Sequence, residues 1–515
     1  MYTREQIEAR HPDYNANIAR WRLYADSYQG GASYRNGEYL FQYQLETSGE
    51  YQQRLDETPL ENHCRRTVDS YSSFIYGANI ERDYGSIENN PNLKPFLKDA
   101  DLDGRSFDNF IREAGKWASI YGAVYIVVDK PESNAGTRAD ELSQGIRPYI
   151  SLISPENVVD WHYERMPNGK MQMTYMKVIE RTVQHDTPGN YTTYGKIMTP
   201  DMVYKFKYTR GDTNATVTDE YVNALGEIPV VVLYNNRTWQ ANIGISDLAD
   251  ISDIQRSIYS DYSEINQLVK LSNHPTLVKT LDTEASAGAG AIITMPSDGM
   301  DPGLKPYLLT PSGQNISTLL ETINTKAQAI DKMTHLDSVS GQKSARSGVA
   351  MLIEQKALAS LLSDKASNLA LAEEQIWRLW CLWEGTAWDG EVIYPDSFDT
   401  RDRTQDLENL KLAKEIGVSN PALVQYMESS IASAIVDDAD TLQDINDSIY
   451  GAVDPANHMT TTPANRTAHI QTMIMDGLTD QQILDLHPEI SQADIDVAKQ
   501  ALLDTNNDNL EQTEG

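Results

Sequence analysis

Few residues in this chain have the types and spacing that enzyme chemistry requires. His63 and Cys64 place a base beside a nucleophile, but adjacent residues on a helix diverge, so we expect no activated thiolate. The sequence has no His-Glu-x-x-His motif and no paired Cys-x-x-Cys motif, the usual zinc-binding spacings. These residues therefore predict no catalytic site and no zinc site.

Two acidic clusters near the C-terminus are the remaining metal candidates. The stretch from Asp504 begins like a calcium-binding loop, yet its twelfth position is Gly515 where such a loop requires a glutamate. Asp437, Asp438 and Asp440 would bind divalent cations loosely, and a solvated acidic surface explains them better. We expect no metal ion.

Nucleotide-binding motifs are missing as well. No Gly-x-x-x-x-Gly-Lys-Ser/Thr sequence is present, so the chain is not expected to be a P-loop motor. Gly288 and Gly290 lack the third glycine and the following helix of a dinucleotide-binding fold, and are interpreted as a flexible loop. The sequence thus predicts a protein without cofactors that is not an enzyme.

One polar stretch, Asp337–Gly348, joins the ends of two predicted helices. Its hydrogen-bonding and charged side chains include Ser340, Gln342, Lys343, Ser344 and Arg346. The helix that follows extends to Glu384 without Pro or Gly, which predicts a length of roughly 55 Å. A small polar loop at the start of so long a helix is explained if another molecule moves past the loop. The alternative is an ordinary solvated loop between helices.

Hydrophobic periodicity predicts the elements that position this loop. The long helix has one apolar stripe, made of Met351, Leu358, Leu362, Leu369, Ala372, Ile376, Leu379 and Trp383. An earlier helix is predicted from Ser246, a good N-cap, with Asp247 and Asp250 in its favourable first turn. Its near-heptad stripe contains Leu248, Ile251, Ile258, Tyr262 and Ile265. Another helix is predicted over 316–333, after a β-rich insertion.

The chain before Ser246 combines helices with strands. Helices are predicted around Trp21, from Pro59 to Gly77 and from Phe107 to Tyr121. The apolar run 123–128 predicts a buried strand, and residues 148–232 alternate in the manner of β-strands. The fold class expected is therefore α+β, mainly helical.

Composition sets further limits. The 515 residues carry a net charge of −32, which argues against an open basic face for nucleic acid but not against a channel that DNA slides through. From Thr404 onward 20 acidic residues face four basic ones, so this region is predicted to be solvated and helical with a disordered tail. No apolar run is long enough to span a membrane, and no signal peptide is expected at the N-terminus. Two cysteines fit a reducing compartment.

The order of these elements, with several sequence stretches, resembles tailed-bacteriophage portal proteins. The stretches are Trp21–Gly31, Asn62–Asp69, Leu225–Arg237, Ser347–Met351 and Leu361–Lys365. The resemblance covers roughly residues 15–400 and lies in the order of elements, because the family has no catalytic signature.

The resemblance implies the portal fold with wing, stem, clip and crown regions. The corresponding ranges are 1–245 for the wing, 246–272 and 313–335 for the stem helices, 273–312 for the clip, 336–347 for a tunnel loop, 348–403 for the long helix and its return to the wing, and 404–515 for an acidic helical crown. Leu248, Ile251, Ile258, Tyr262 and Ile265 would then pack stem helices together in the oligomer. Ser340, Gln342, Lys343, Ser344 and Arg346 would face DNA, with too few cations to hold it.

The resemblance also implies partners and a location. The subunits would form a ring, usually a dodecamer, at one capsid vertex of the virion, after assembly in the host cytoplasm. Double-stranded DNA would pass without sequence specificity, driven by the terminase large subunit. Head-tail adaptor, major capsid and scaffolding proteins would be further partners, and no membrane is involved. The alternatives are a non-portal phage structural or adaptor subunit and a phage-encoded hydrolase.

Overall fold

The structure is a computed structural model of the chain. It describes residues 3–131, 136–184, 191–209, 212–273, 276–278, 307–309, 314–337, 348–395 and 398, with six single positions between 425 and 499. The chain divides into two compact units, Met1–Asp399 and Thr400–Gly515. The predicted crown, 404–515, therefore lies almost entirely outside the described residues, and everything below concerns the first unit.

The N-terminal part of this unit is helical. Its helices are α1 (Arg4–Glu8), α2 (Pro12–Gln29), α3 (Gly31–Tyr34), α4 (Ser48–Glu57) and α5 (His63–Tyr76). The helix predicted around Trp21 is α2, and it stops at Gly30, whose φ of 63° favours glycine. The helix predicted from Pro59 begins later, at an N-cap where the Asn62 side chain accepts a hydrogen bond from the Arg65 amide.

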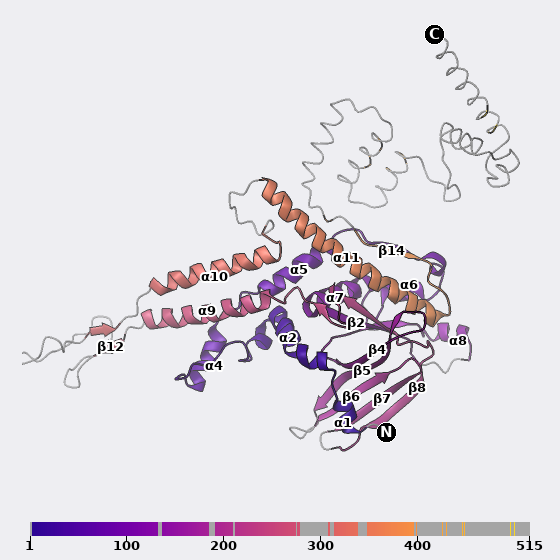
Figure 1. Cartoon of the computed structure of the whole chain (residues 1–515), viewed down its shortest axis with the longest axis horizontal. Coiled ribbons are helices and arrows are strands. Elements are labelled where there is room, and N and C mark those ends of the chain that lie inside the picture. Colours follow the sequence, from indigo (N-terminus) through magenta and orange to yellow (C-terminus); the bar gives the residue numbers. More distant parts are fainter. Residues whose placement is uncertain are drawn as a thin grey trace, which may run out of the picture. The chain divides into compact units, whose positions relative to one another are not determined.

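A three-stranded antiparallel sheet forms the centre of the unit. Its order is β3 (Tyr149–Ile153), β2 (Ala123–Asp129), β9 (Val230–Tyr234). Residues 123–128 of β2 are all buried, and alternate side chains point to opposite faces, so both faces of the strand are covered. Helix α7 (Phe107–Tyr121) and the long helix α11 (Gly348–Glu384) pack against this sheet (Figure 1). The predicted buried strand is confirmed.

A five-stranded antiparallel meander forms the second sheet. Its strands follow the chain in order: β4 (Val158–Arg165), β5 (Met171–Gln184), β6 (Tyr191–Met198), β7 (Met202–Thr209) and β8 (Thr216–Val222). Helix α1 covers part of it, where Ile7 is buried against Ile197 and Phe206. Helices together with two antiparallel sheets confirm the α+β class.

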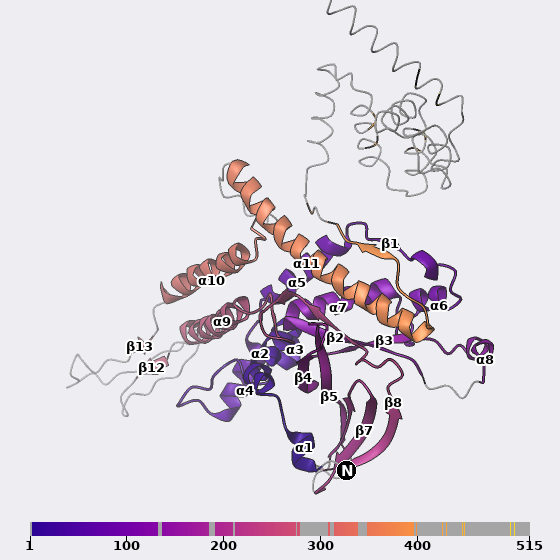
Figure 2. The same cartoon turned by 45° about the vertical axis from the view of Figure 1, so that its right-hand side comes forward.

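Helices α9 (Ile251–Asn273) and α10 (Gln314–Met333) lie side by side and project from the sheets in both views (Figures 1 and 2). Beyond them, β12 (Thr276–Val278) pairs with β13 (Tyr307–Leu309), which agrees with a β-rich insertion. The predicted start of α9 at Ser246 is wrong, because residues 247–250 form turns. Ser246 donates to the Ile120 carbonyl and accepts from the Leu248 amide, so it fastens a turn to α7.

Helix α11 is deeply buried from Leu358 onward. Leu358, Leu362, Leu369, Ala372, Ile376 and Leu379 of the predicted stripe are buried, Trp383 is half-buried, and Met351 lies outside the described side chains. Trp377 and Trp380 are fully buried as well, with the Trp377 ring 4.8 Å from that of Phe107 between centroids. Hydrophobic burial therefore fixes this end of the helix to the sheet.

Short elements complete the unit around α11. They are β1 (Glu81–Asp83), η1 (Gly85–Ile87), α6 (Leu93–Lys98), α8 (Arg138–Ser143), β10 (Asn236–Arg237), β11 (Gly244–Ile245) and β14 (Glu391–Ile393). Strand β14 pairs with β1 after the long helix ends. Glu373, buried on α11, accepts hydrogen bonds from Arg82 of β1 and from the Tyr394 hydroxyl at 2.8 Å.

Candidate functional site

The candidate site lies around the polar loop 336–347, which connects α10 to α11, and includes helix α9 beside α10. Helices α9 and α10 are joined by a cation from α10. Lys326 Nζ lies 2.5 Å from Asp261 Oδ2 and 2.7 Å from Ser257 Oγ. Ser257 and Asp261 are four residues apart, so both side chains lie on the face of α9 that meets α10. The pair therefore behaves as one hairpin.

The end of α10 is fixed to helix α5. The Tyr71 hydroxyl donates a buried hydrogen bond of 2.7 Å to the Thr334 carbonyl, and Arg66 Nη2 lies 2.7 Å from Asp331 Oδ1. His335 then adopts a left-handed φ of 54°, which ends the helix, and Leu336 is buried. The connecting loop thus leaves from a defined point.

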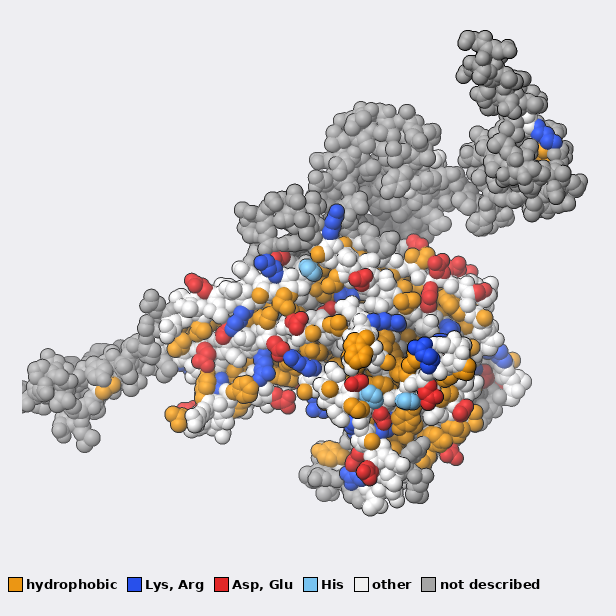
Figure 3. Space-filling model, in the orientation of Figure 1, with side chains coloured by type: hydrophobic (Ala, Val, Ile, Leu, Met, Phe, Trp, Pro, Cys, Tyr) orange, Lys and Arg blue, Asp and Glu red, His pale blue; other side chains and the backbone are white. Residues whose placement is uncertain are grey.

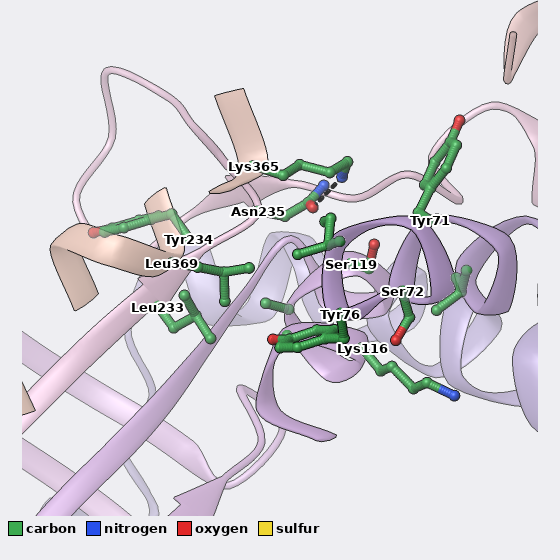
Figure 4. A pocket seen from close by; sticks show the side chains of 14 residues that line it. Tyr71, Ser72, Tyr76, Lys116, Ser119, Leu233, Tyr234, Asn235, Lys365 and Leu369 are labelled. Atoms are coloured by element: carbon green, nitrogen blue, oxygen red, sulfur yellow. Dashed lines mark hydrogen bonds between the residues drawn. The ribbon is translucent and has the colours of Figure 1, made fainter. Parts of the chain in front are cut away.

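Helix α11 is fixed by a buried ion pair. Lys365 Nζ lies 2.6 Å from Asp247 Oδ2 and 2.8 Å from Oδ1, and it also donates to Asn235 Oδ1 (Figure 4). Both charged side chains are under one-tenth exposed. Burial lowers the pKa of Lys365, and the nearby Asp247 carboxylate opposes that shift. Asp247 also accepts a hydrogen bond from the Ser119 hydroxyl, so the pair links α11 to α7 and to the turn before α9.

Tyr71 connects the two anchors. Its hydroxyl holds the end of α10, and Lys365 Nζ lies 5.3 Å from the centroid of its ring. Burial raises the pKa of the Tyr71 phenol, so it stays a neutral donor. A cavity of about 20 Å³ lies alongside, lined by Tyr71, Ser72 and Lys365 among others, which is room for a single water molecule (Figure 4).

Two glycines allow the backbone segments of this junction to come together. A Cβ on Gly122 would lie 2.3 Å from the Gly244 carbonyl oxygen, and a Cβ on Gly244 would lie 1.9 Å from the Gly122 oxygen. Gly122 also has a φ of 90°, which favours glycine. The close approach brings the end of α7 against β11, and Asn235 donates its backbone amide to the Gly122 carbonyl.

The predicted loop residues cannot be compared with this geometry. Ser340, Gln342, Lys343, Ser344 and Arg346 lie outside the described residues, and so does most of the predicted clip, 273–312. Their roles stay predictions. What the structure describes is the anchored end of α10, from which the loop starts, and the anchored middle of α11, the helix to which the loop returns.

Four of the five stem residues predicted to pack between subunits are buried inside the single subunit. Leu248, Ile251, Ile258 and Ile265 are buried within the subunit's own core, at most 8% exposed, and Tyr262 is half-buried with its hydroxyl donating to Glu61. The four buried side chains are occupied inside the subunit, so a charge at Leu248 or Ile258 would unfold the subunit rather than block assembly. Gln255 of α9 is also buried; its side chain accepts a hydrogen bond from the Cys64 amide and donates one to the Ser27 carbonyl.

Sequence reasoning misses the ion pair at the junction. It places Asp247 in the first turn of a helix, and Lys365 enters it only as the end of a stretch that resembles the portal family. One signal is present, because Lys365 falls between Leu362 and Leu369 at helical spacing, on the apolar stripe itself. A lysine there requires a carboxylate partner.

In the described part of the chain, no group of three or more His, Cys, Asp or Glu side chains is arranged to hold a metal ion. No helix of that part is long and apolar enough to cross a bilayer.

Comparison with known proteins identifies relatives. A family model described as "Phage portal protein, SPP1 Gp6-like" matches residues 49–391. No curated protein sequence matches the chain. Among solved structures, a chain of "Neck of empty GTA particle computed with C6 symmetry" has 10% identity and a TM-score of 0.41, covering 72% of this chain and 91% of that one. A chain of "Virion of native gene transfer agent (GTA) particle" has 11% identity and a TM-score of 0.39, covering 71% and 89%.

Proposed function

Since the chain belongs to the SPP1 Gp6-like family of phage portal proteins, a family of structural proteins rather than enzymes, we propose that it forms a DNA-conducting ring in a virion. The ring would occupy one capsid vertex, and double-stranded DNA would be packaged and ejected through its centre. The family match is the observation that carries the proposal. It spans every element of the first unit from α4 to the start of β14.

The regions of the proposed portal follow the elements of the first unit. The wing comprises 1–245 and 348–403, which include both sheets and α11. The stem, 246–272 and 313–335, corresponds to α9 and α10, and the clip, 273–312, includes β12 and β13. The crown would be 404–515. The projection of the α9–α10 hairpin from the sheets supports a stem that narrows a channel (Figures 1 and 2).

We assign the contact with DNA to the tunnel loop, 336–347. Lys343 and Arg346 give each subunit two cations, which in a ring would meet phosphates from all sides. Phosphate affinity grows with the number of such contacts and falls steeply with salt, so two per subunit permit contact without retention. The Tyr71 anchor supports this role, because it fixes the end of α10 from which the loop starts, and Lys365 holds the middle of α11.

The partners proposed are those of a head-to-tail connector. The terminase large subunit would supply the energy for packaging, and a head-tail adaptor would replace it afterwards. Major capsid and scaffolding proteins would surround the wing. The oligomer proposed is a dodecamer, assembled in the host cytoplasm and located in the virion.

Electron microscopy of the purified protein tests the ring. Negative staining at several protein and salt concentrations should reveal closed rings with a central channel. Particles that stay monomeric under all of these conditions would contradict the proposal.

A packaging assay tests the loop. Replacing Lys343 and Arg346 with Ala should leave rings intact and reduce the yield of particles with full-length DNA. Lys94→Ala with Lys98→Ala removes the same charge from exposed positions on α6 and serves as the control. Normal packaging by the loop variant would contradict the proposed contact between this loop and DNA. Loss of rings would instead indicate that the loop is a structural contact within the oligomer.

A further inference from the structure

A short apolar loop stands exposed between α3 and α4. Phe41, Tyr43 and Leu45 are 74%, 41% and 96% exposed, and they alternate with Gln42 and Gln44. Large apolar side chains at this exposure are costly in water when they cluster, and such clusters mark interaction sites. We name residues 41–45 the apolar loop.

The apolar loop is held in shape by a buried arginine. Arg54 donates to the Phe41 carbonyl at 2.6 Å, to both oxygens of Glu46 at 2.8 and 2.7 Å, and to Ser263 of α9 at 3.0 Å. Its guanidinium also lies 4.0 Å from the centre of the Tyr43 ring. A loop fixed before binding loses little conformational entropy on binding, which favours a recognition role.

A groove of about 460 Å³, lined by both apolar and polar side chains, lies on a different part of the same unit. It runs between β9, the outer side of α11 and the turn 237–241. Trp239 and Leu371 line it with 93% and 52% of their surface exposed, and Met171 is 48% exposed. Tyr43 of the apolar loop donates to Glu264 of α9, whereas the groove lies on the C-terminal half of α11, so one subunit presents both at once. Figure 3 shows hydrophobic side chains at the surface both near α4 and over the sheets, there among Lys and Arg.

The two surfaces are complementary in charge. The residues that line the groove include Arg237 and Arg378 and no Asp or Glu, and Arg378 pairs with Glu227 at 2.5 Å. Near the apolar loop, Glu38 and Glu50 are exposed, Glu46 is paired with Arg54, and the Arg256 guanidinium lies 5.1 Å from the centre of the Phe41 ring. Exposed apolar side chains near Glu38 and Glu50 therefore face, on another copy, a groove bordered by Arg237.

We propose that the apolar loop of one copy of this chain seats in the groove of the next copy. A closed ring needs a head-to-tail contact made by two different surfaces of the same subunit, and these two meet that requirement. The inference rests on the proposed ring function and specifies its contact. Leu45 and Phe41 fill the groove beside Trp239 and Leu371, while Arg237 meets the acidic residues near the loop.

Cysteine cross-linking of assembled protein tests the contact. The double variant Leu45→Cys with Trp239→Cys should give, on oxidation, a ladder of covalent oligomers up to the full ring. Background is low, because the two native cysteines, Cys64 and Cys381, are buried. The matched control places cysteines at Leu102 and Val222, which are exposed and lie outside both surfaces, and should give no ladder.

Mixing experiments test whether the contact is head-to-tail, that is, whether it joins two different surfaces of neighbouring subunits. Leu45→Cys alone or Trp239→Cys alone should give no covalent product, and a mixture of the two single variants should give cross-links between pairs only. Covalent dimers from either single variant would overturn the head-to-tail arrangement. Rings by microscopy without a ladder from the double variant would overturn this contact and leave the proposed function standing. No rings and no ladder would overturn both.

An assembly assay adds an independent measurement. Leu45→Glu should raise the protein concentration needed for half-maximal ring formation by about tenfold or more, with unchanged circular dichroism and melting temperature. Unchanged assembly would contradict the inference.

Discussion

Two buried cation–carboxylate pairs in this chain have similar chemistry and different effects. Lys365 and Asp247 are 118 residues apart and join α11 to the turn before α9. Arg54 and Glu46 are eight residues apart and shape the apolar loop between α3 and α4. The first pair connects distant elements inside the core, whereas the second presents apolar side chains to the outside.

The choice of cation matches each task. A lysine is a compact charge, and Lys365 meets acceptors that converge on one point, Asp247 and Asn235. An arginine has a planar fork of donors, and Arg54 spreads its bonds over Glu46, Ser263 and the Phe41 carbonyl. The connection between α11 and the turn before α9 needs one strong contact, whereas the apolar loop needs several contacts in defined directions.

The largest effect on stability is expected at the Lys365–Asp247 pair. Lys365→Ala leaves Asp247 buried without its cation, so the free energy of unfolding should fall by about 3–5 kcal/mol. Urea unfolding followed by circular dichroism measures the loss. Lys365→Met with Asp247→Leu removes both charges and should lose less than the single variant. A loss for Lys365→Ala below about 1 kcal/mol would mean that the pair is not what joins the helices.

A smaller effect on stability is expected under the apolar loop. Arg54→Ala should lower the free energy of unfolding by about 1.5–3 kcal/mol, because Glu46 at the edge can regain water when its partner is lost. Amide hydrogen exchange at residues 41–46 should accelerate and ring formation should weaken. Arg54→Lys keeps the positive charge but lacks the planar fork of donors, so its free energy of unfolding should lie between those of the wild type and Arg54→Ala. Unchanged exchange would show that other contacts hold the loop.

Acid pH tests the Arg54–Glu46 pair. The hydrogen bond from Arg54 holds the pKa of Glu46 below its ordinary value of 4.5. A carboxyl with a lowered pKa in the folded state stabilises the fold above the unfolded value, and this stabilisation is lost as pH falls through the folded value. The free energy of unfolding should therefore drop more steeply below about pH 4.5 in the wild type than in Glu46→Gln. Parallel pH curves would exclude Glu46 as the titrating group.

The smallest effect on stability is expected in the proposed tunnel loop. Lys343→Ala with Arg346→Ala should change the free energy of unfolding by less than about 0.5 kcal/mol, because neither cation is proposed to support the core. Thermal unfolding provides the measurement. A larger loss would indicate that the loop, like the two buried pairs, holds the fold together.

Local patterns made much of the fold predictable. The run 123–128 is short, apolar at every position and rich in β-branched residues, which is typical of a strand covered on both faces, and it forms β2. The α11 stripe also follows from spacing alone, since one face of a helix must be buried. The start of α9 was predicted too early, because Ser246 and Asp247 resemble a helix cap while their partners are Ile120 and Lys365, far away in sequence.

The sequence by itself determined the portal resemblance, the order of helices and strands, and the presence of a polar loop before a long helix. Only the tertiary structure decided which polar residues meet and which apolar residues stay outside. Ile258 and Leu45 are both large and aliphatic, yet Ile258 is buried in the core and Leu45 is 96% exposed. Periodicity reports a local face, whereas burial depends on what the rest of the chain places against that face.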